Sequence, residues 1–430
     1  MNAKQDKLPN YQLESLCCYH HFEDKKWELN CPFSHEPALI RSRYTDKLFE
    51  INELPGIYRF SCWLPINKIL EGSAAPVTYK SEHLAKKLGL SNLYITFNGY
   101  WPEKGAWMKT ASFKECEAYS VCARNNPNTN KIMVVASAGN TARAFAKVCS
   151  ENKIPLLICI PEDNLNALWF EKELDNCVKI VSTEKGSDYF DAIHLSNIAC
   201  EIDGFFPEGG AKNVARRDGM GTTVLSAVST IGAIPDFYFQ AIGSGTGAIA
   251  AWEANLRFIE DGRFGNHKMK LILSQNEPFT PIKLAWDKKS RDLFSISDDQ
   301  ARKDAAIIDA KVLANRKPPY SLVGGLFDAL SETEGEVLSI TNKEARMASN
   351  LFKELEKSDI DSAAAIAVAS LIKKTQEKNF DKNAVIMLNI TSGGAERFRQ
   401  EHKTINAMAE HIFRLNTDKE EIKKVLNNLF

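Results

Sequence analysis

The sequence lacks a net charge, a long apolar run and a targeting segment. Its 54 basic and 55 acidic residues leave a formal charge of −1, so no global field favours nucleic acid or an anionic membrane surface. No apolar run approaches the ~20 residues that span a bilayer, and the first ten residues lack the apolar core of a secretory signal. We therefore expect a cytoplasmic protein that binds no nucleic acid and no membrane and acts on small molecules.

The ten cysteines do not form the dense pattern of a disulfide-bonded secreted domain. Several of them, such as Cys149 and Cys159, lie in apolar segments and are typical of reduced core residues. The first fifty residues also contain a Cys/His cluster that only loosely resembles a zinc ribbon, because paired Cys-x-x-Cys knuckles are missing. We expect no metal there, although a zinc site stays open as the alternative. The cluster consists of Cys17, Cys18, His20, His21, Cys31 and His35.

The pattern of strands and helices predicts an α/β protein. With 430 residues the chain exceeds what one hydrophobic core usually supports, so we expect two lobes with a ligand cleft between them. From about residue 130, β-rich runs alternate with segments of helical period, which is typical of a mostly parallel sheet flanked by helices. The predicted strands are Ile132–Ser137, Pro155–Ile160, Val178–Ser182, Asp236–Ile242, Met269–Ser274 and Asn383–Ile390. The predicted helices are Thr141–Asn152, Tyr189–Glu201, Met220–Ile231, Ala248–Ile259, Lys343–Leu355 and Ser362–Lys378.

The predicted domains follow from this order. Residues 1–50 form an N-terminal extension, residues 118–225 a small domain, and residues 51–117 with 226–430 a large domain into which the small one is inserted. The charged segment 285–320 is predicted to be a solvated helical connector, with a mobile lid as the alternative. Residues 418–430 are predicted to form an amphipathic helix.

Lys114 is the candidate covalent anchor. A lysine condenses with a carbonyl group only when its amine is neutral, and desolvation beside apolar groups lowers its pKa. Ala111 and Phe113 supply such neighbours. Most lysines are surface charges, so the hypothesis depends on position: Lys114 precedes the first strong strand–helix unit, and three further motifs follow it.

A strand-to-helix junction forms the second motif, Ser137-Ala138-Gly139-Asn140-Thr141. Open α/β sheets bind ligands at this end of their strands, and N–H groups at a helix start can hold an α-carboxylate. The amide of Asn140 can bond a ring hydroxyl. An ordinary capped turn would use the same residues.

The third motif is the loop Gly243-Ser244-Gly245-Thr246-Gly247, between a predicted strand and a predicted helix. Backbone amides freed of side chains, together with a helix N-terminus and two hydroxyls, form a cradle for a phosphate. A dinucleotide site is the rival, but the Gly-x-Gly-x-Gly spacing lacks the register of that fingerprint. The loop therefore favours a single phosphate.

Thr391 forms the fourth motif, directly after the predicted strand that ends at Ile390. Its hydroxyl can bond a ring nitrogen without a full charge, which leaves a milder electron sink that suits elimination and replacement; Ser392 is the alternative. The four motifs together supply a covalent anchor, a ring-hydroxyl contact, a phosphate cradle and a ring-nitrogen contact. We therefore predict pyridoxal 5'-phosphate as the cofactor.

With these motifs placed, the chain resembles the fold-type II pyridoxal phosphate enzymes, and within them the threonine synthase branch. The resemblance implies two lobes, each with a mostly parallel sheet flanked by helices, with the small lobe inserted in the large cofactor-binding one. It also implies a homo-oligomer. The matching segments are Pro76–Thr78, Leu84–Tyr94, Ser112–Lys114, Ala136–Ala142 and Gln275–Ile282.

The sequence also departs from threonine synthases in two places. Those enzymes follow the anchoring lysine with Asp-Arg and precede it with Asn-Pro-Thr-Gly, where this chain has Glu115-Cys116 and Trp107–Thr110. The segment Glu208–Thr222 adds cations on the expected substrate side. This pattern is similar to that of a paralogue that serves coenzyme M biosynthesis.

The resemblance to that paralogue implies conversion of O-phospho-L-serine and sulfite into L-cysteate and phosphate, through a Schiff base on Lys114 and an aminoacrylate. Two anionic groups require fixed positive charge, for which we favour Lys109 and Arg216. Lys104, Lys212 and Arg217 are the other candidates.

Three alternatives stay open. One is threonine synthase acting on O-phosphohomoserine, and another is a phosphoserine-using cysteine synthase, because sulfite and sulfide cannot be told apart from the sequence. The third is a regulatory paralogue that binds the cofactor without catalysis.

Overall fold

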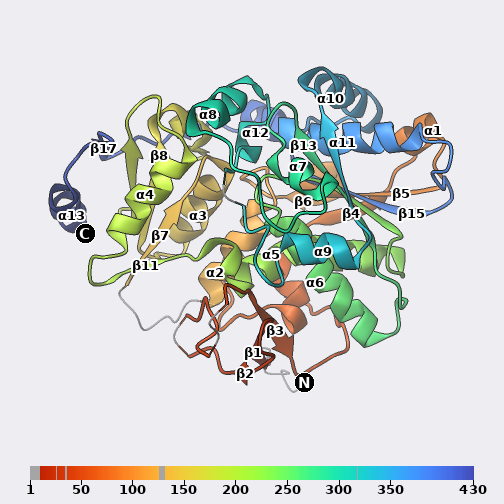
Figure 1. Cartoon of the computed structure of the whole chain (residues 1–430), viewed down its shortest axis with the longest axis horizontal. Coiled ribbons are helices and arrows are strands. Elements are labelled where there is room, and N and C mark those ends of the chain that lie inside the picture. The colour runs from red at the N-terminus through yellow and green to blue at the C-terminus, as the bar shows by residue number, and fades with distance from the viewer. Residues whose placement is uncertain (1–9, 26, 34–35, 125–130, 317) are drawn as a thin grey trace.

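A computed structural model describes residues 10–25, 27–33, 36–124, 131–316 and 318–430. His35 of the Cys/His cluster lies outside these ranges. Two sheets form the cores of two lobes, and a small third sheet lies near the N-terminus (Figure 1). Among the described residues no helix combines the length and hydrophobicity needed to cross a bilayer. The ten cysteines form no disulfide.

The large lobe contains a seven-stranded sheet. Five neighbouring strands are parallel, in the order β14-β13-β12-β15-β5, and β4 and β6 pair antiparallel with β5. Buried apolar runs form the central strands, as expected for a sheet covered on both faces. The strands are β4 (Val77–Lys80), β5 (Asn92–Trp101), β6 (Ala106–Trp107), β12 (Phe237–Ala241), β13 (Lys270–Asn276), β14 (Glu336–Ile340) and β15 (Val385–Gly393).

Helices cover both faces of this sheet. Helix α11 packs on β12, β13 and β15 and is backed by α10, whereas α5 packs on β4 and β5 and is backed by α6 (Figure 1). The helices of this lobe are α1 (His83–Leu88), α5 (Val214–Ile231), α6 (Thr246–Asp261), α7 (Pro281–Asp287), α8 (Asp298–Ile307), α9 (Leu326–Glu332), α10 (Asn342–Glu356), α11 (Ser362–Thr375) and α12 (Ala395–Glu401).

The small lobe contains a five-stranded parallel sheet in the order β11-β7-β8-β10-β17. Helix α4 packs on β7, β8 and β10 and is contacted by α13. Helix α3 packs on the same three strands and is contacted by α2. The strands are β7 (Ile132–Ala136), β8 (Leu156–Pro161), β10 (Val178–Thr183), β11 (Phe205–Pro207) and β17 (His411–Phe413). The helices are α2 (Lys114–Arg124), α3 (Asn140–Glu151), α4 (Tyr189–Ala199) and α13 (Lys419–Asn427). The short strands β9 (Trp169–Phe170) and β16 (Ile405–Asn406) pair beside it.

The N-terminal extension is an antiparallel sheet of β1 (Tyr11–Ser15), β2 (His21–Phe22) and β3 (Ile40–Tyr44). Buried charges attach it to the large lobe. Glu253 of α6, 1% exposed, accepts hydrogen bonds from Arg41 of β3 at 3.2 Å and from Arg217 of α5 at 2.9 Å. Arg217 is fully buried in this contact, so the structure does not bring it to a ligand cleft.

The predicted fold class is confirmed. All six predicted strands and all six predicted helices are present, and most bounds agree within three residues. Helix α5 is the largest difference, because it begins at Val214, before the predicted start at Met220, although Gly219 and Gly221 lower the helix propensity of this stretch. Strand β5, which pairs with β15, β4 and β6 in the large sheet, was not predicted.

The predicted domain division stays a proposal, which we change in two respects. Residues 214–225 belong to helix α5, which packs on β4 and β5, so we propose them as part of the large domain. Strand β17 extends the small sheet beside β10, and Ile422 and Leu426 of α13 are buried against the small lobe. We therefore propose that residues 411–427 belong to the small domain. The predicted terminal helix is the amphipathic α13.

Neutralising Glu253 tests the attachment of the N-terminal sheet. Glu253→Gln leaves two buried guanidinium groups without their counter-charge, so we expect the free energy of unfolding to fall by about 3–5 kcal/mol. Glu260→Gln, on the same helix but in a pair with 38% of its side chain exposed, should cost less than about 1 kcal/mol. Denaturant unfolding measures both, and equal losses would contradict the assignment.

Candidate active site

A cavity of about 630 Å³ lies between the two lobes and brings the four motifs together. Lys114, Thr391, the whole segment Ser137–Thr141 and the whole loop Gly243–Gly247 line it. These residues come from the N-termini of α2, α3 and α6 and from the end of β15. This is the strand end at which open α/β sheets bind ligands.

A short antiparallel contact holds Lys114 beside Thr391. Phe113 N donates to Thr391 O at 2.9 Å, and Gly393 N donates to Ala111 O at 3.2 Å. Ser112 and Ser392 form a β-bridge between these two bonds. Helix α2 begins at the next residue, so the Lys114 side chain starts where strand β15 ends.

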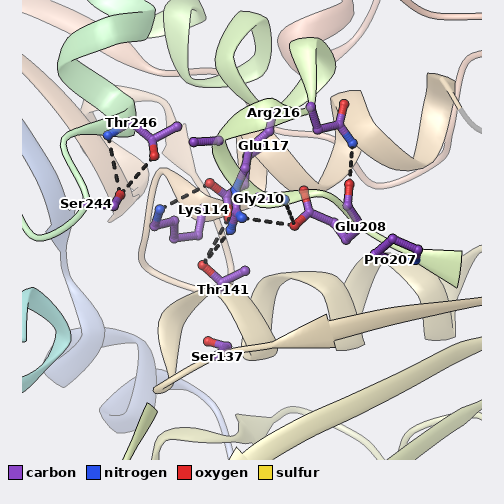
Figure 2. A network of polar contacts seen from close by, with 12 residues as sticks. Lys114, Glu117, Ser137, Thr141, Pro207, Glu208, Gly210, Arg216, Ser244 and Thr246 are labelled. Atoms are coloured by element: carbon purple, nitrogen blue, oxygen red, sulfur yellow. Dashed lines mark hydrogen bonds and ion pairs between the residues drawn. The ribbon is translucent and has the colours of Figure 1, made fainter. Parts of the chain in front are cut away.

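The amine of Lys114 belongs to a network of buried charges (Figure 2). Its Nζ donates to Glu117 Oε2 at 3.1 Å. The other oxygen of Glu117 accepts from Arg216 Nη2 at 2.8 Å and from Thr141 Oγ1 at 3.0 Å. Arg216 Nη1 donates to Glu208 Oε2 at 2.9 Å. Two cations and two carboxylates therefore alternate along one wall of the cavity.

The network shifts the pKa values of its members. Burial lowers the pKa of the Lys114 amine, Glu117 opposes this shift and Arg216 adds to it. Burial alone would raise the pKa of Glu117, but the charges of Arg216 and Lys114 lower it. Burial raises the pKa of Glu208 despite its contact with Arg216. Lys114 thus has an amine that loses its proton more readily than a surface lysine does.

The glycine loop has the shape of a phosphate cradle. Gly245 adopts φ = +77°, and a Cβ on Gly243 would lie 2.9 Å from the backbone of Leu313. Ser244 and Thr246 hydroxyls lie 2.9 Å apart at the start of the 16-residue helix α6. Gly243–Gly247 and Lys114 line the same cavity, and Figure 2 shows Ser244 bonded to the hydroxyl and the amide of Thr246.

Asn140 is held in a fixed orientation. Its Oδ1 accepts from Arg143 Nη2 at 2.9 Å, so its Nδ2 is the group left to donate, and it lies 3.5 Å from Asp361 Oδ2.

Ser137 Oγ accepts from the backbone of Gly139 and Ala142, each at 3.0 Å, and so fixes the turn that precedes α3.

The structure distinguishes between Thr391 and Ser392. Thr391 lines the cavity, whereas the hydroxyl of Ser392 donates to Ala111 O at 2.6 Å and does not line it. Thr391 is therefore the hydroxyl available to a ring nitrogen.

Only part of the predicted set of basic residues reaches the cavity. Lys114, Lys212 and Arg216 are the basic residues among its described lining. Lys109 pairs with Glu171 at 2.6 Å in a separate depression, and 50% of its side chain is exposed. Lys104 lies over the ring of Tyr79. The structure thus places Lys212, rather than the favoured Lys109, beside Arg216.

Sequence reasoning missed several residues of the site. Glu117 lies one helical turn after Lys114, and that i, i+3 spacing is a signal that could have suggested the ion pair. Asp361 caps α11 and lines the cavity, and burial raises the pKa of its carboxyl group. Leu313, Ala314 and residues 318–319 also line it, so the charged segment 285–320 crosses the edge of the cavity.

The residues present fit pyridoxal phosphate. A desolvated amine, a glycine cradle with two hydroxyls at a helix start, an oriented amide and a strand-end hydroxyl share one cavity, in the number and kinds that this cofactor needs.

Comparison with known proteins agrees with this geometry. The family model "Pyridoxal-phosphate dependent enzyme" matches residues 79–392. The chain therefore belongs to the pyridoxal-phosphate dependent enzymes. Its similarity to curated relatives places it, within that family, beside the cysteate synthases. The relative from Methanosarcina acetivorans is 46% identical over 92% of this chain and 94% of its own length, and that from Methanospirillum hungatei is 42% identical over 92% of each.

Solved structures show the same fold. Maize serine racemase has a TM-score of 0.59 and 13% identity, over 76% of this chain and 91% of its own. The diaminopropionate ammonia lyase from Escherichia coli has a TM-score of 0.58 and 13% identity, over 78% and 89%. The fold is thus that of fold-type II pyridoxal phosphate enzymes.

Removing the charge of Glu117 tests the network around Lys114. Glu117→Gln deletes the anion that raises the amine pKa and leaves Arg216 nearby, so the pKa of Lys114 should fall. The pH at which apo-protein binds the cofactor at half its maximal rate should fall equally, as followed by visible absorption. Glu171→Gln, which removes the partner of Lys109, should leave that pH unchanged. An upward shift in Glu117→Gln would contradict the network.

Proposed function

We propose that the protein catalyses a pyridoxal phosphate-dependent β-replacement, in which O-phospho-L-serine and hydrogensulfite give L-cysteate and hydrogenphosphate. The similarity to cysteate synthases over nine-tenths of the chain supports the reaction. The observation that carries the proposal is one cavity lined by Lys114, the glycine cradle and the two further cations Lys212 and Arg216.

Each contact of the cofactor has a proposed residue. Lys114 would hold its aldehyde carbon, Gly243–Gly247 its phosphate, Asn140 its ring hydroxyl and Thr391 its ring nitrogen. When bound, the cofactor supplies an electron sink that stabilises negative charge at the α-carbon of an amino acid. A neutral hydroxyl at Thr391 keeps that sink mild, which suits loss of a β-substituent.

Lys114 is proposed to move the α-proton. Its Nζ takes the proton from the substrate α-carbon and returns it after the nucleophile has added at the β-carbon. Burial favours the neutral amine that accepts a proton, and Glu117 at 3.1 Å stabilises the ammonium that results. Lys114 can therefore change between the neutral amine and the ammonium while it stays beside Glu117.

Anionic groups of the substrates are proposed to meet two parts of the cavity. The turn Ser137–Thr141 at the start of α3 would bind the α-carboxylate. Lys212 and Arg216 would face the departing phosphate and the incoming hydrogensulfite, since both carry negative charge. The segment around Leu313 borders the same space and would help to exclude water.

We also propose that the protein works in the cytoplasm as a homo-oligomer in coenzyme M biosynthesis. The resemblance to the threonine synthase branch and to its paralogue supports this proposal. Light scattering of the purified protein measures the number of subunits.

Product analysis tests the reaction. Purified protein loaded with cofactor is given phosphoserine together with hydrogensulfite, sulfide or water, and separately phosphohomoserine. We expect cysteate, identified by mass, only with hydrogensulfite. Cysteine as the main product would indicate a cysteine synthase, threonine from phosphohomoserine a threonine synthase, and no turnover a regulatory protein.

Lys114→Ala should abolish turnover, because the substitution deletes both the cofactor anchor and the proton carrier. We expect the rate of cysteate formation to fall by at least about 10³-fold. The fold should remain, which circular dichroism and the thermal midpoint check. Near-normal turnover in a folded variant would contradict the assignment.

Lys212→Met distinguishes the cation in the cavity from the one outside it. Loss of a charge-assisted contact should lower kcat/KM for phosphoserine about tenfold to a hundredfold. Lys109→Met, which removes an exposed cation paired with Glu171, is the matched control and should change it less than about twofold. A larger loss of kcat/KM in Lys109→Met than in Lys212→Met would instead indicate that Lys109 contacts the substrate.

A further inference from the structure

Three cysteine side chains converge in the N-terminal extension, and none of them lines the cofactor cavity. The sulfur atoms of Cys17, Cys18 and Cys31 all lie within 4.8 Å of one another, and Cys18 Sγ lies 3.6 Å from Cys31 Sγ. Cys17 and Cys18 are neighbours, but Cys31 is thirteen residues away, so the fold itself creates the cluster.

A tight turn presents two of these thiols and an imidazole together. Tyr19 N donates to Ser15 O at 2.9 Å, Ser15 N donates to His20 O at 3.0 Å, and Tyr19 adopts φ = +58°. His20 follows directly in this turn, with an exposed side chain that lies outside the group of three sulfur atoms. Cys31 lies at the end of the segment that follows β2, and Phe33 N donates to its sulfur at 3.3 Å.

The spacing of the sulfur atoms matches one ligand chemistry. Two thiolates on a tetrahedral zinc ion, each at about 2.3 Å from the metal, lie about 3.8 Å apart, close to the 3.6 Å between Cys18 and Cys31. A disulfide would instead need about 2.05 Å. The distance between the sulfur atoms of Cys18 and Cys31 is thus close to that between two thiolate ligands of one zinc ion.

We propose that this cluster binds a single zinc ion through Cys17, Cys18 and Cys31, and that the exposed side chain of His20 turns toward the ion to become the fourth ligand. Three thiolates and one imidazole form a closed tetrahedral set, which is typical of structural zinc. The soft sulfur donors disfavour magnesium and calcium.

The N-terminal sheet has a physical need for such a ligand. Its own buried apolar cluster has few members, Leu13, Ile40 and Val214, and the last of these belongs to α5. Small units with little apolar core are commonly stabilised by a metal or a disulfide. The ion would tie the turn after β1 to the end of the segment 22–31.

That segment lies against the edge of the cofactor cavity. Trp27 Nε1 donates to Pro207 O at 3.0 Å, and Lys212 Nζ donates to Asn30 Oδ1 at 2.7 Å. Gly209, which lines the cavity, lies directly against Leu29. By fixing Cys31, the metal would hold Asn30 in place to orient Lys212.

Metal analysis of the full chain tests the site. Protein purified under reducing conditions is assayed for zinc and iron by mass spectrometry, and we expect about one zinc per chain. Cys31→Ser should lower zinc at least about fivefold. Cys62→Ser, a partly buried cysteine outside the cluster, is the matched control and should retain it. Iron in place of zinc, a Cys18–Cys31 disulfide, or zinc unchanged in Cys31→Ser would each overturn the proposal.

A second measurement uses the unaltered chain, so it does not depend on whether a variant folds. Cobalt exchanged into the wild-type protein should give the intense absorption of thiolate-to-cobalt charge transfer, and a mercurial that blocks thiols should abolish it and lower the thermal midpoint. His20→Ala should weaken zinc binding at least about tenfold, as measured by competition with a chromogenic chelator. Cobalt absorption without thiolate character, or a thermal midpoint insensitive to metal release, would overturn the proposal. Neither measurement depends on the proposed reaction.

Discussion

The contact between residues 111–113 and 391–393 is the constraint on which the site depends. Two backbone hydrogen bonds and one β-bridge join segments that are 280 residues apart, and they fix the start of the Lys114 side chain next to the strand end that carries Thr391. Ala111 adopts φ = +50° in this contact, a conformation that costs a non-glycine residue some free energy. The backbone fixes the end of β15 and the start of α2 together. The residues proposed to hold the aldehyde carbon and the ring nitrogen of the cofactor, Lys114 and Thr391, would therefore keep a constant spacing of their backbones.

The second requirement is charge balance within a desolvated wall. An isolated buried ammonium would be strongly destabilised, and an isolated buried carboxylate equally so. Lys114, Glu117, Arg216 and Glu208 alternate in charge, so each cation lies next to a carboxylate and each carboxylate next to a cation. Lys114 shares its carboxylate partner, Glu117, with Arg216. The same arrangement explains why Arg216, predicted as a phosphate ligand, also serves to orient Glu117.

Much of the fold and most of the site could be predicted from the sequence, because they depend on local patterns. The βα alternation predicted the six strands β7, β8, β10, β12, β13 and β15, and the glycine spacing predicted the loop at 243–247. Contacts set by the tertiary fold could not be predicted. Nothing in the vicinity of Lys109 indicates that its side chain turns to Glu171, and nothing local shows that Lys212 reaches the cavity. Strand β5 was missed because buried Thr96 and Asn98 interrupt its apolar pattern, and Asn98 is paired inside the sheet with Asn389.

The position of β15 and β17 has a consequence for biogenesis. Strand β15 lies between β12 and β5 in the large sheet, and β17 covers the outer edge of β10 in the small one. Neither sheet is complete until residues 385–413 have left the ribosome. The two lobes therefore cannot finish folding one after the other while the chain is being made. During synthesis the flanks of β5, β10 and β12 stay open to strand addition from other nascent chains. Dependence on chaperones is therefore expected to be greatest just before translation ends.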